Sequence, residues 1–449
     1  MISHSPNYTR IGSDFAPAPG QLRVAVFAGS AGVSPASQIP GSAGVSPASG
    51  ICDALVREGV HVRLFGSTGV SPELANEING FDVVLKFSGC GDSDREIEEM
   101  LLDRCAGSAS IIFVDADVPG NLRDISAHVG SGFPNPDRSR TAHVGSGFPN
   151  PDRPRTASVG SGFPNPDRSG FGNPEPTVVR LEPTVVRLES TVVRLESTVV
   201  RLDPTAVRLD PTADNPDHFR RALIPRFDAV LVTSGGPTAC DAYESLGARR
   251  TGTLYPALGP NDCAPTFTDE DMECDVLFAG DREADTDNTV RELFFTTAAI
   301  RPDCRFILAG KGWDGMELPE NVRYIGPLTA KNRAEAYSSA RFVLSIAPES
   351  AKEYGFCPTA GLFEAASSGA CVISDSWPGL GSFFKPDWEI LVAHTARDMS
   401  IYLDAMYGHT AARLGNRAWE RVMTDHTHEA RTRDLLALAH ELRASLVMA

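Results

Sequence analysis

The chain has 449 residues, of which 42% are hydrophobic and 22% charged, and its formal net charge is -17 at pH 7. This length suits two or three globular domains, and the negative charge argues against nucleic acids and anionic membrane surfaces as partners. No apolar run approaches the roughly 20 residues of a membrane-spanning helix, and residues 1–21 lack the apolar core of a secretory signal. We therefore expect a cytoplasmic protein without a transmembrane segment.

Residues 1–20 are expected to be disordered, and an alternating strand–helix pattern follows them. The predicted strands are residues 22–28, 61–65, 81–87, 110–114 and 227–232, and the predicted helices are residues 50–58, 94–103 and 237–246. The strand runs are apolar throughout, which is typical of a parallel sheet covered on both faces. Residues 21–126 and 214–260 therefore predict one doubly wound, Rossmann-like α/β domain.

Near-identical repeats interrupt this first domain. The segment HVGSGFPNPDR begins at His128 and again at His143, and TVVRL recurs every seven residues from Thr177. Prolines inside the seven-residue repeats would break the helix that their period suggests. Because packed repeats usually diverge, the near-identity indicates translated nucleotide repeats, and we predict a passive, mostly disordered insert at residues 127–213. A short solenoid of small strands and a tethering role are the alternatives.

The strand–helix pattern restarts after residue 260. The predicted strands are residues 275–279, 305–309, 322–325, 342–346, 371–374 and 390–393, and the predicted helices are residues 288–300, 332–340, 359–367 and 396–406. Residues 261–408 therefore predict a second doubly wound domain, and residues 409–449 predict helices that cross back over the domain junction. Ligands of such sheets bind at the carboxyl ends of the strands, where loops meet helix N-termini.

The segment with the most chemical information precedes the helix predicted at residues 359–367. A glycine-containing loop with Gly355 runs into a helix that begins near Pro358 and Thr359. Backbone N–H groups at such a helix start bind phosphate, so these three residues are candidates for holding a diphosphate. Glu364 lies one turn inside this helix, and its carboxylate can accept hydrogen bonds from both vicinal hydroxyls of a ribose. A solvated or capping glutamate is the alternative.

Several motifs of the second half occur together in one known family. They are Phe363–Ala366 with Gly369–Cys371, Ser374–Leu380, Glu389–Ala393, Ala309–Trp313 and Asn321–Gly326, joined in the first domain by Leu223–Asp228 and Gly235–Pro237. With these motifs, residues 272–405 resemble the glycosyltransferase domain of the spore-maturation CgeB-type proteins, which are relatives of the GT-B nucleotide-sugar transferases. The resemblance implies a GT-B fold, in which two Rossmann-like domains face a cleft. It also implies that the glutamate matching Glu364 holds the nucleotide ribose.

Other positions match the family only in part. Its members carry basic residues toward the diphosphate after the first strand of this domain, and Arg282 matches one of them. Lys311, beside Gly310 in a loop after the next strand, is a second candidate, although a lysine there is also commonly a solvated loop residue. Two family features are missing, because Phe356 stands eight positions before the ribose glutamate, where relatives have an acidic residue, and Gly361 stands where CgeB-type relatives have an arginine.

The first domain supplies weaker candidates on the acceptor side. Gly29 and Ser30 begin the repeated segment GSAGVSPAS, which occupies the place of the family's Gly/Ser-rich loop. Asp115 and Asp117 form an Asp-x-Asp-x-Pro pattern at a strand end, and in a GT-B protein we expect this pattern to be structural or to contact the acceptor rather than a metal. The nine cysteines include no CxxC pair, which indicates reduced thiols rather than a metal site. No catalytic base can be assigned.

Two functions follow from these patterns. The first is transfer of a sugar from a nucleotide-diphosphate-sugar donor, without metal or other cofactor, to a glycan, protein or small-molecule acceptor. The second is a catalytically degenerate protein that binds the nucleotide sugar without turning it over. A dinucleotide-dependent oxidoreductase is disfavoured, because no GxGxxG motif with a suitably spaced acidic residue follows the first strand.

Overall fold

A computed structural model shows how these elements are assembled. It describes residues 4–5, 8–9, 11–12, 17–18, 20–28, 47–66, 72–88, 94–105, 107–116, 118, 216–259 and 264–448. The described residues from 4 to 118 and from 216 to 448 belong to one compact unit. The predicted disordered insert at residues 127–213 lies outside the described residues.

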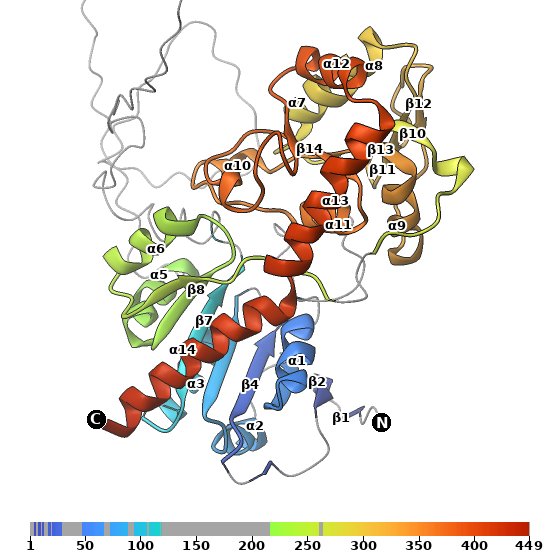
Figure 1. Cartoon of the computed structure of the whole chain (residues 1–449). Helices are drawn as coiled ribbons and strands as arrows, with labels where there is room; N and C mark the ends of the chain where they lie inside the picture. The colour runs from blue at the N-terminus through green and yellow to red at the C-terminus, as the bar shows by residue number, and fades with distance from the viewer. Residues whose placement is uncertain are drawn as a thin grey trace, which may run out of the picture. The chain divides into compact units, whose positions relative to one another are not determined.

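The first sheet has, among the described residues, seven strands in the order β3-β5-β4-β6-β7-β8-β9 (Figure 1). They are β3 (Ile11–Gly12), β4 (Arg23–Ala28), β5 (His61–Gly66), β6 (Val83–Phe87), β7 (Ser110–Asp115), β8 (Ala229–Val232) and β9 (Thr251–Thr253). All neighbours pair in parallel except the edge strand β3, which is antiparallel to β5. A separate antiparallel pair is formed by β1 (His4–Ser5) and β2 (Tyr8–Thr9). The predicted doubly wound sheet is confirmed.

Helices cover both faces of this sheet. They are α1 (Pro47–Arg57), α2 (Pro72–Ile78), α3 (Asp94–Arg104), α5 (Pro216–Leu223) with the short η2 (Ile224–Arg226), and α6 (Gly236–Ser245). Alternate residues of β4 enter different apolar clusters, since Ala25 and Phe27 pack with α3 and α6 whereas Val24 and Val26 pack with α1. Burial on both sides is why this strand is apolar at nearly every position.

The second sheet is parallel throughout and has the order β12-β11-β10-β13-β14-β15 among the described residues. Its strands are β10 (Cys274–Ala279), β11 (Phe306–Ala309), β12 (Val322–Tyr324), β13 (Ala340–Ser345), β14 (Cys371–Ser374) and β15 (Leu391–Val392). The chain winds outward from β10 to β12 and then returns to place β13 on the other side of β10. The strand order therefore reverses between β10 and β13, and a doubly wound sheet binds ligands beyond the carboxyl ends of the strands at such a reversal.

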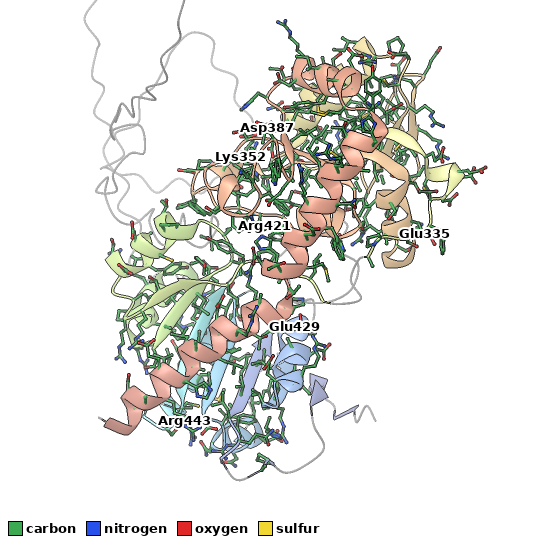
Figure 2. All side chains as sticks on the ribbon, viewed as in Figure 1. Glu335, Lys352, Asp387, Arg421, Glu429 and Arg443 are labelled. Atoms are coloured by element: carbon green, nitrogen blue, oxygen red, sulfur yellow. The ribbon has the colours of Figure 1, made fainter. Side chains whose placement is uncertain are left out.

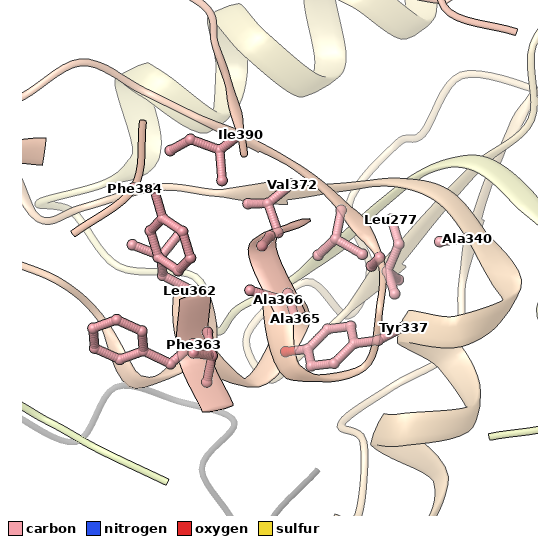
Figure 3. Close-up of a cluster of buried hydrophobic side chains, with 14 of the residues drawn as sticks. Leu277, Tyr337, Ala340, Leu362, Phe363, Ala365, Ala366, Val372, Phe384 and Ile390 are labelled. Carbon is pink, nitrogen blue, oxygen red and sulfur yellow. The ribbon is translucent and has the colours of Figure 1, made fainter. Parts of the chain in front are cut away.

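Helices also enclose the second sheet. They are the continuous segment α7 (Asp287–Val290), η4 (Arg291–Thr296) and α8 (Thr297–Ile300), then α9 (Ala330–Ser339), α10 (Glu349–Lys352), α11 (Ala360–Ser367) and α12 (Ala396–Ala405), with the short turns η3 (Glu270–Met272) and η5 (Leu380–Ser382). One apolar cluster joins α9 and α11 to the sheet through side chains such as Tyr337, Leu362 and Val372 (Figure 3). A second cluster on the opposite face joins the sheet to α8 and α12.

Two helices end the chain, α13 (Gly408–Asp425) and α14 (His428–Met448). Ala418 and Val422 of α13 pack in the core of the second domain, whereas Leu435 and Ala439 of α14 pack on the first domain beside α1. Ion pairs accompany each contact. Two of them, labelled in part in Figure 2, join Arg421 to Glu389 at 3.0 Å and Glu429 to Arg57 at 2.6 Å. The two C-terminal helices thus contact one domain each. None of the described helices is long and apolar enough to cross a membrane.

His426 lies in the turn between α13 and α14, buried against the ring of Phe363. Its Nε2 lies 3.1 Å from the carbonyl oxygen of Phe383, and its Nδ1 lies 3.0 Å from Nη2 of Arg431. A carbonyl can only accept and a guanidinium can only donate, so the ring is neutral with its proton on Nε2. Burial, and then the nearby Arg431, lower the pKa of His426 to about 4.

We expect this histidine to make folding stability depend on pH. The pKa of His426 is lower in the folded chain than the ordinary 6.5 that applies when unfolded, so its contribution is complete above pH 6.5 and is lost as the pH falls through 4. The whole effect is about 3 kcal/mol at most, since one pKa unit corresponds to about 1.4 kcal/mol. Urea unfolding across this range measures it. His426→Gln should show a flatter pH profile than the wild type, and the exposed His409→Gln serves as control; identical profiles for all three proteins would contradict the assignment.

Candidate active site

A pocket opens at the point where the strand order of the second sheet reverses. It is lined by the end of β10 with the loop that follows, by the end of β13, and by the start of α11, and the space of about 660 Å³ beside these residues includes open solvent. Phe278, Tyr337 and Ile346 supply apolar wall, and Ser345 and Thr359 supply hydroxyl groups. A concave, largely apolar pocket with a few convergent polar groups is the usual form of a small-molecule site.

The start of α11 forms one wall of this pocket, as the sequence predicts for Thr359. The Thr359 hydroxyl caps the helix by accepting the N–H of Leu362 at 3.1 Å, and it lies 3.4 Å from the Ser345 hydroxyl. Gly361 also lines the pocket, and a methyl group at this position would meet nothing closer than 4.0 Å. The first N–H groups of a helix have no partner inside it and carry its positive dipole end, so this wall can accept an anion.

Glu364 lies one turn deeper in α11 than Gly361, on the same face of the helix. It is buried, and its Oε2 accepts a hydrogen bond of 3.0 Å from Nη1 of Arg333, which is itself buried on α9. The hydroxyls of Ser367 and Ser368 donate to the Glu364 carbonyl and so help to end the helix. Glu364 is therefore buried rather than solvated, and it lies one turn from the lining residue Gly361 without being among the lining residues itself.

The predicted cations are not among the residues that line the pocket. Arg282 is exposed, its Nε lies 3.2 Å from Asp287, and its guanidinium lies 5.8 Å from the ring centre of Trp313. Lys311 is also exposed, and its backbone N–H donates to Asp281 at 2.6 Å. Among the described residues that line the pocket there is no lysine or arginine, whereas the carboxylates of Asp281 and Glu283 are present.

Glu283 lies close to other carboxylates. Burial, and then the neighbouring carboxylates of Asp281 and Asp285, raise the pKa of Glu283 above its ordinary value. A pocket wall of this charge favours ligand groups that donate hydrogen bonds, such as sugar hydroxyls. The start of α11, with its N–H groups, is therefore the part of the pocket wall that suits phosphate.

The two predicted glycines shape the backbone around the site. Gly310 has φ +131, and a methyl group there would lie 2.1 Å from the carbonyl oxygen of Gly280, so only glycine lets the loops after β10 and β11 approach this closely. Gly355 has φ +72 and packs against Pro378, and its carbonyl accepts the N–H of Gly235 at 3.1 Å. Pro358 is buried just before the start of α11.

Of the residues predicted on the acceptor side, the structure describes only Asp115. Asp115 is buried at the end of β7, where one oxygen accepts the Tyr243 hydroxyl at 2.6 Å and the other lies 3.4 Å from the Ser88 hydroxyl. Burial, and then the charge of Asp115, raise the pKa of Tyr243 well above its ordinary value. Asp115 therefore belongs to a buried hydrogen-bond network, while Gly29, Ser30 and Asp117 lie outside the described residues. No group of three or more potential metal ligands occurs in the part of the chain that the structure describes.

The sequence prediction missed several residues of this site. Tyr337 and Arg333 are spaced i and i+4 on α9, which predicts a shared helix face. Nothing in the sequence indicates that this face meets α11, because Arg333 and Glu364 are 31 positions apart. Asp281 and Glu283 flank the predicted Arg282 in the chain, yet it is they that line the pocket.

Comparisons with known proteins agree with this architecture. Residues 265–437 match the family described as Glycosyl transferase-like. Sucrose-phosphate synthase from Thermosynechococcus elongatus has a similar structure, with a TM-score of 0.55 and 13% identity over 95% of this chain and 100% of that chain. HepE from Anabaena, in complex with UDP and glucose, matches with a TM-score of 0.52 and 8% identity over 94% and 100%. A glycosyltransferase from Rickettsia africae matches with a TM-score of 0.50 and 9% identity over 94% and 99%. No curated protein matches the chain.

At such low identities the structural likeness shows the fold, and the family match adds a glycosyltransferase-like domain in the half of the chain that holds the pocket. Together they support a transferase enzyme. Residues 265–437 thus match a glycosyl transferase-like family, within a chain whose two parallel-sheet α/β domains resemble those of the GT-B glycosyltransferases.

Proposed function

We propose that this protein transfers a sugar from a nucleotide-diphosphate-sugar donor to an acceptor and that the pocket beyond β10 and β13 binds the donor. The observation that carries the proposal is the position of this pocket, which lies where the strand order reverses and has the capped start of α11 as one wall. In the narrower form of the proposal the protein is CgeB-type and cytoplasmic, which rests on the sequence motifs from Phe363 to Leu380 and on the chain's composition.

The diphosphate is assigned to the start of α11, where the N–H groups of Ala360 and Gly361 have no partner within the helix. Such donors stabilise the charge that develops on the departing diphosphate without needing a bound metal. The ribose is assigned to Glu364, one turn further along the same helix face. Because HepE was solved with UDP, we propose uridine diphosphate sugars as the first donors to test.

A nucleotide-sugar-binding protein without turnover is the second candidate. The specific observation in its favour is the charge of the pocket wall, to which Asp281 and Glu283 contribute carboxylates and no described lysine or arginine contributes a cation. A donor could bind such a pocket through the helix start alone, whereas stabilising the leaving diphosphate would gain from a cation beside it.

Calorimetric titration of the full chain with UDP, UDP-glucose and the matching GDP and dTDP compounds tests donor binding. A donor present at about 100 times its dissociation constant should stabilise the fold by about 2.7 kcal/mol in thermal unfolding. Glu364→Gln should weaken binding by roughly 10- to 100-fold, because each charge-assisted hydrogen bond to the ribose contributes about 1.5–3 kcal/mol. The exposed Glu317→Gln serves as the matched control.

Three outcomes separate the candidates. Binding together with release or transfer of the sugar, unchanged by a chelator of divalent metals, supports the metal-independent transferase. Binding without any turnover favours the degenerate protein. Absence of binding to every donor contradicts both.

A further inference from the structure

The ion pair between Arg333 and Glu364 has an unusual environment for two full charges. Their relative exposures are 4% and 7%, and the two groups meet at 3.0 Å. The Nη2 atom of Arg333 is also buried and has no hydrogen-bond partner among the residues that the structure describes. A buried pair with an unsatisfied donor adds little net stability, because the cost of removing both charges from water offsets their attraction.

This pair lies directly behind the proposed donor pocket. On α9, Arg333 is one turn before Tyr337, which lines the pocket, and on α11, Glu364 is one turn after Gly361, which also lines it. The two helices pack together at this level, and Figure 3 shows the Tyr337 ring directed toward α11 beside Ala365. Arg333 therefore contacts the one carboxylate of α11 next to the pocket and largely out of contact with solvent.

The charge state of this carboxylate depends on its neighbour. A buried carboxyl without a cation favours its protonated form, whereas an adjacent guanidinium, which stays protonated at all relevant pH values, favours the ionised form. Only the ionised group accepts strong hydrogen bonds from both hydroxyls of a ribose, and a hydrogen bond from Arg333 also fixes its orientation.

We propose that Arg333 is a positioning residue that keeps Glu364 ionised and oriented for the donor ribose. The inference rests on the function proposed above, since it assigns a role to the arginine only if Glu364 contacts the nucleotide. It identifies a residue outside the pocket lining that sets donor affinity.

Arg333→Met tests this role through the pH dependence of UDP binding, measured by calorimetry between about pH 5.5 and pH 8.5. We expect affinity for UDP to fall roughly tenfold or more at neutral pH and to recover as the pH rises, because a buried carboxyl that has lost an adjacent guanidinium gives up its proton at a higher pH than before. UDP itself also ionises in this range, so the pH profile of the variant is compared with that of the wild type measured with the same ligand. Arg333→Lys, which restores a cation, should return the pH profile to that of the wild type.

Matched variants separate positioning from a general loss of structure. Arg341→Met removes another arginine of this domain, which pairs with Asp275 at 3.4 Å at the opposite end of the sheet, and it should bind UDP as the wild type does. If Arg333→Met does not fold, Arg333→Gln carries the same expectation. Combining Arg333→Met with Glu364→Gln should weaken binding no further than Glu364→Gln alone.

The results distinguish this inference from the function on which it rests. If Glu364→Gln binds UDP as tightly as the wild type, the ribose assignment fails and the role of Arg333 fails with it. If Glu364→Gln weakens binding but Arg333→Met keeps the affinity and pH profile of the wild type, only the positioning role is overturned. The positioning role is also overturned if Arg333→Lys, which keeps a cation, shows the same affinity and pH profile as Arg333→Met.

Discussion

Gly310→Ala is expected to destabilise the fold by about 2–6 kcal/mol, which is a large share of the stability of an ordinary domain. Two costs add at this position. The backbone has φ +131, a conformation that side-chain-bearing residues rarely adopt, and the new methyl group would lie 2.1 Å from the carbonyl oxygen of Gly280. That oxygen belongs to backbone rather than to a flexible side chain, and the adjacent N–H of Gly280 is held by Ala309 at 2.9 Å, so the loop cannot yield cheaply.

Gly315→Ala is the matched control for this change. Gly315 also has a positive φ, +72, but nothing lies within 4 Å of an added methyl group, so we expect a cost of only about 1–2 kcal/mol. Urea unfolding of both variants isolates the steric part of the effect. Because Gly280 and Asp281 line the pocket, Gly310→Ala should also weaken any donor binding that the wild type shows. Equal stability of the two variants would contradict the close approach of the loops.

Gly415→Ala is the second change with a large expected effect. Gly415 lies inside α13, where replacing glycine by alanine would ordinarily stabilise a helix by about 0.5–1 kcal/mol. Here the methyl group would lie 2.1 Å from the carbonyl oxygen of Gly369, in the turn that follows α11. We expect the overlap to dominate and the variant to lose about 1–3 kcal/mol or more, because α13 would have to move away from the core that it covers.

Gly408→Ala provides the control within the same helix. Gly408 begins α13, and no atom lies within 4 Å of an added methyl group, so this variant should be as stable as the wild type or slightly more so. Thermal unfolding of the two variants gives the comparison. A Gly415→Ala protein that gains stability, as helix propensity alone predicts, would show that α13 does not pack this closely on the end of α11.

The elements of the fold could be predicted where local signals agree. The strand expected at residues 371–374 is observed with those bounds, since a short run apolar at nearly every position between glycine and polar residues suits a buried parallel strand. The start of α11 follows from Pro358 and the capping hydroxyl of Thr359. The prediction missed α5 and the short strand β9, because α5 has a low apolar content and three residues of strand give no recognisable period.

For the site, the sequence predicted the backbone element that lines the pocket but not which loop side chains do so. The sequence indicated the α11 start and Glu364, and the structure places the start of α11 in the pocket wall. The basic residues chosen from the same loops do not reach it, since Arg282 turns toward Asp287 and Trp313. The direction of a loop side chain is not periodic, so position in the sequence cannot predict it.

By itself, then, the sequence determined two alternating strand–helix domains and the helix start that lines the pocket, because these depend on neighbouring residues in the chain. Only the tertiary structure decided that Glu364 pairs with Arg333, that Asp281 and Glu283 line the pocket, and that Gly310 allows two loops to approach. Each of these features joins residues from different elements, and the packing of the sheet and its helices sets the distances between them.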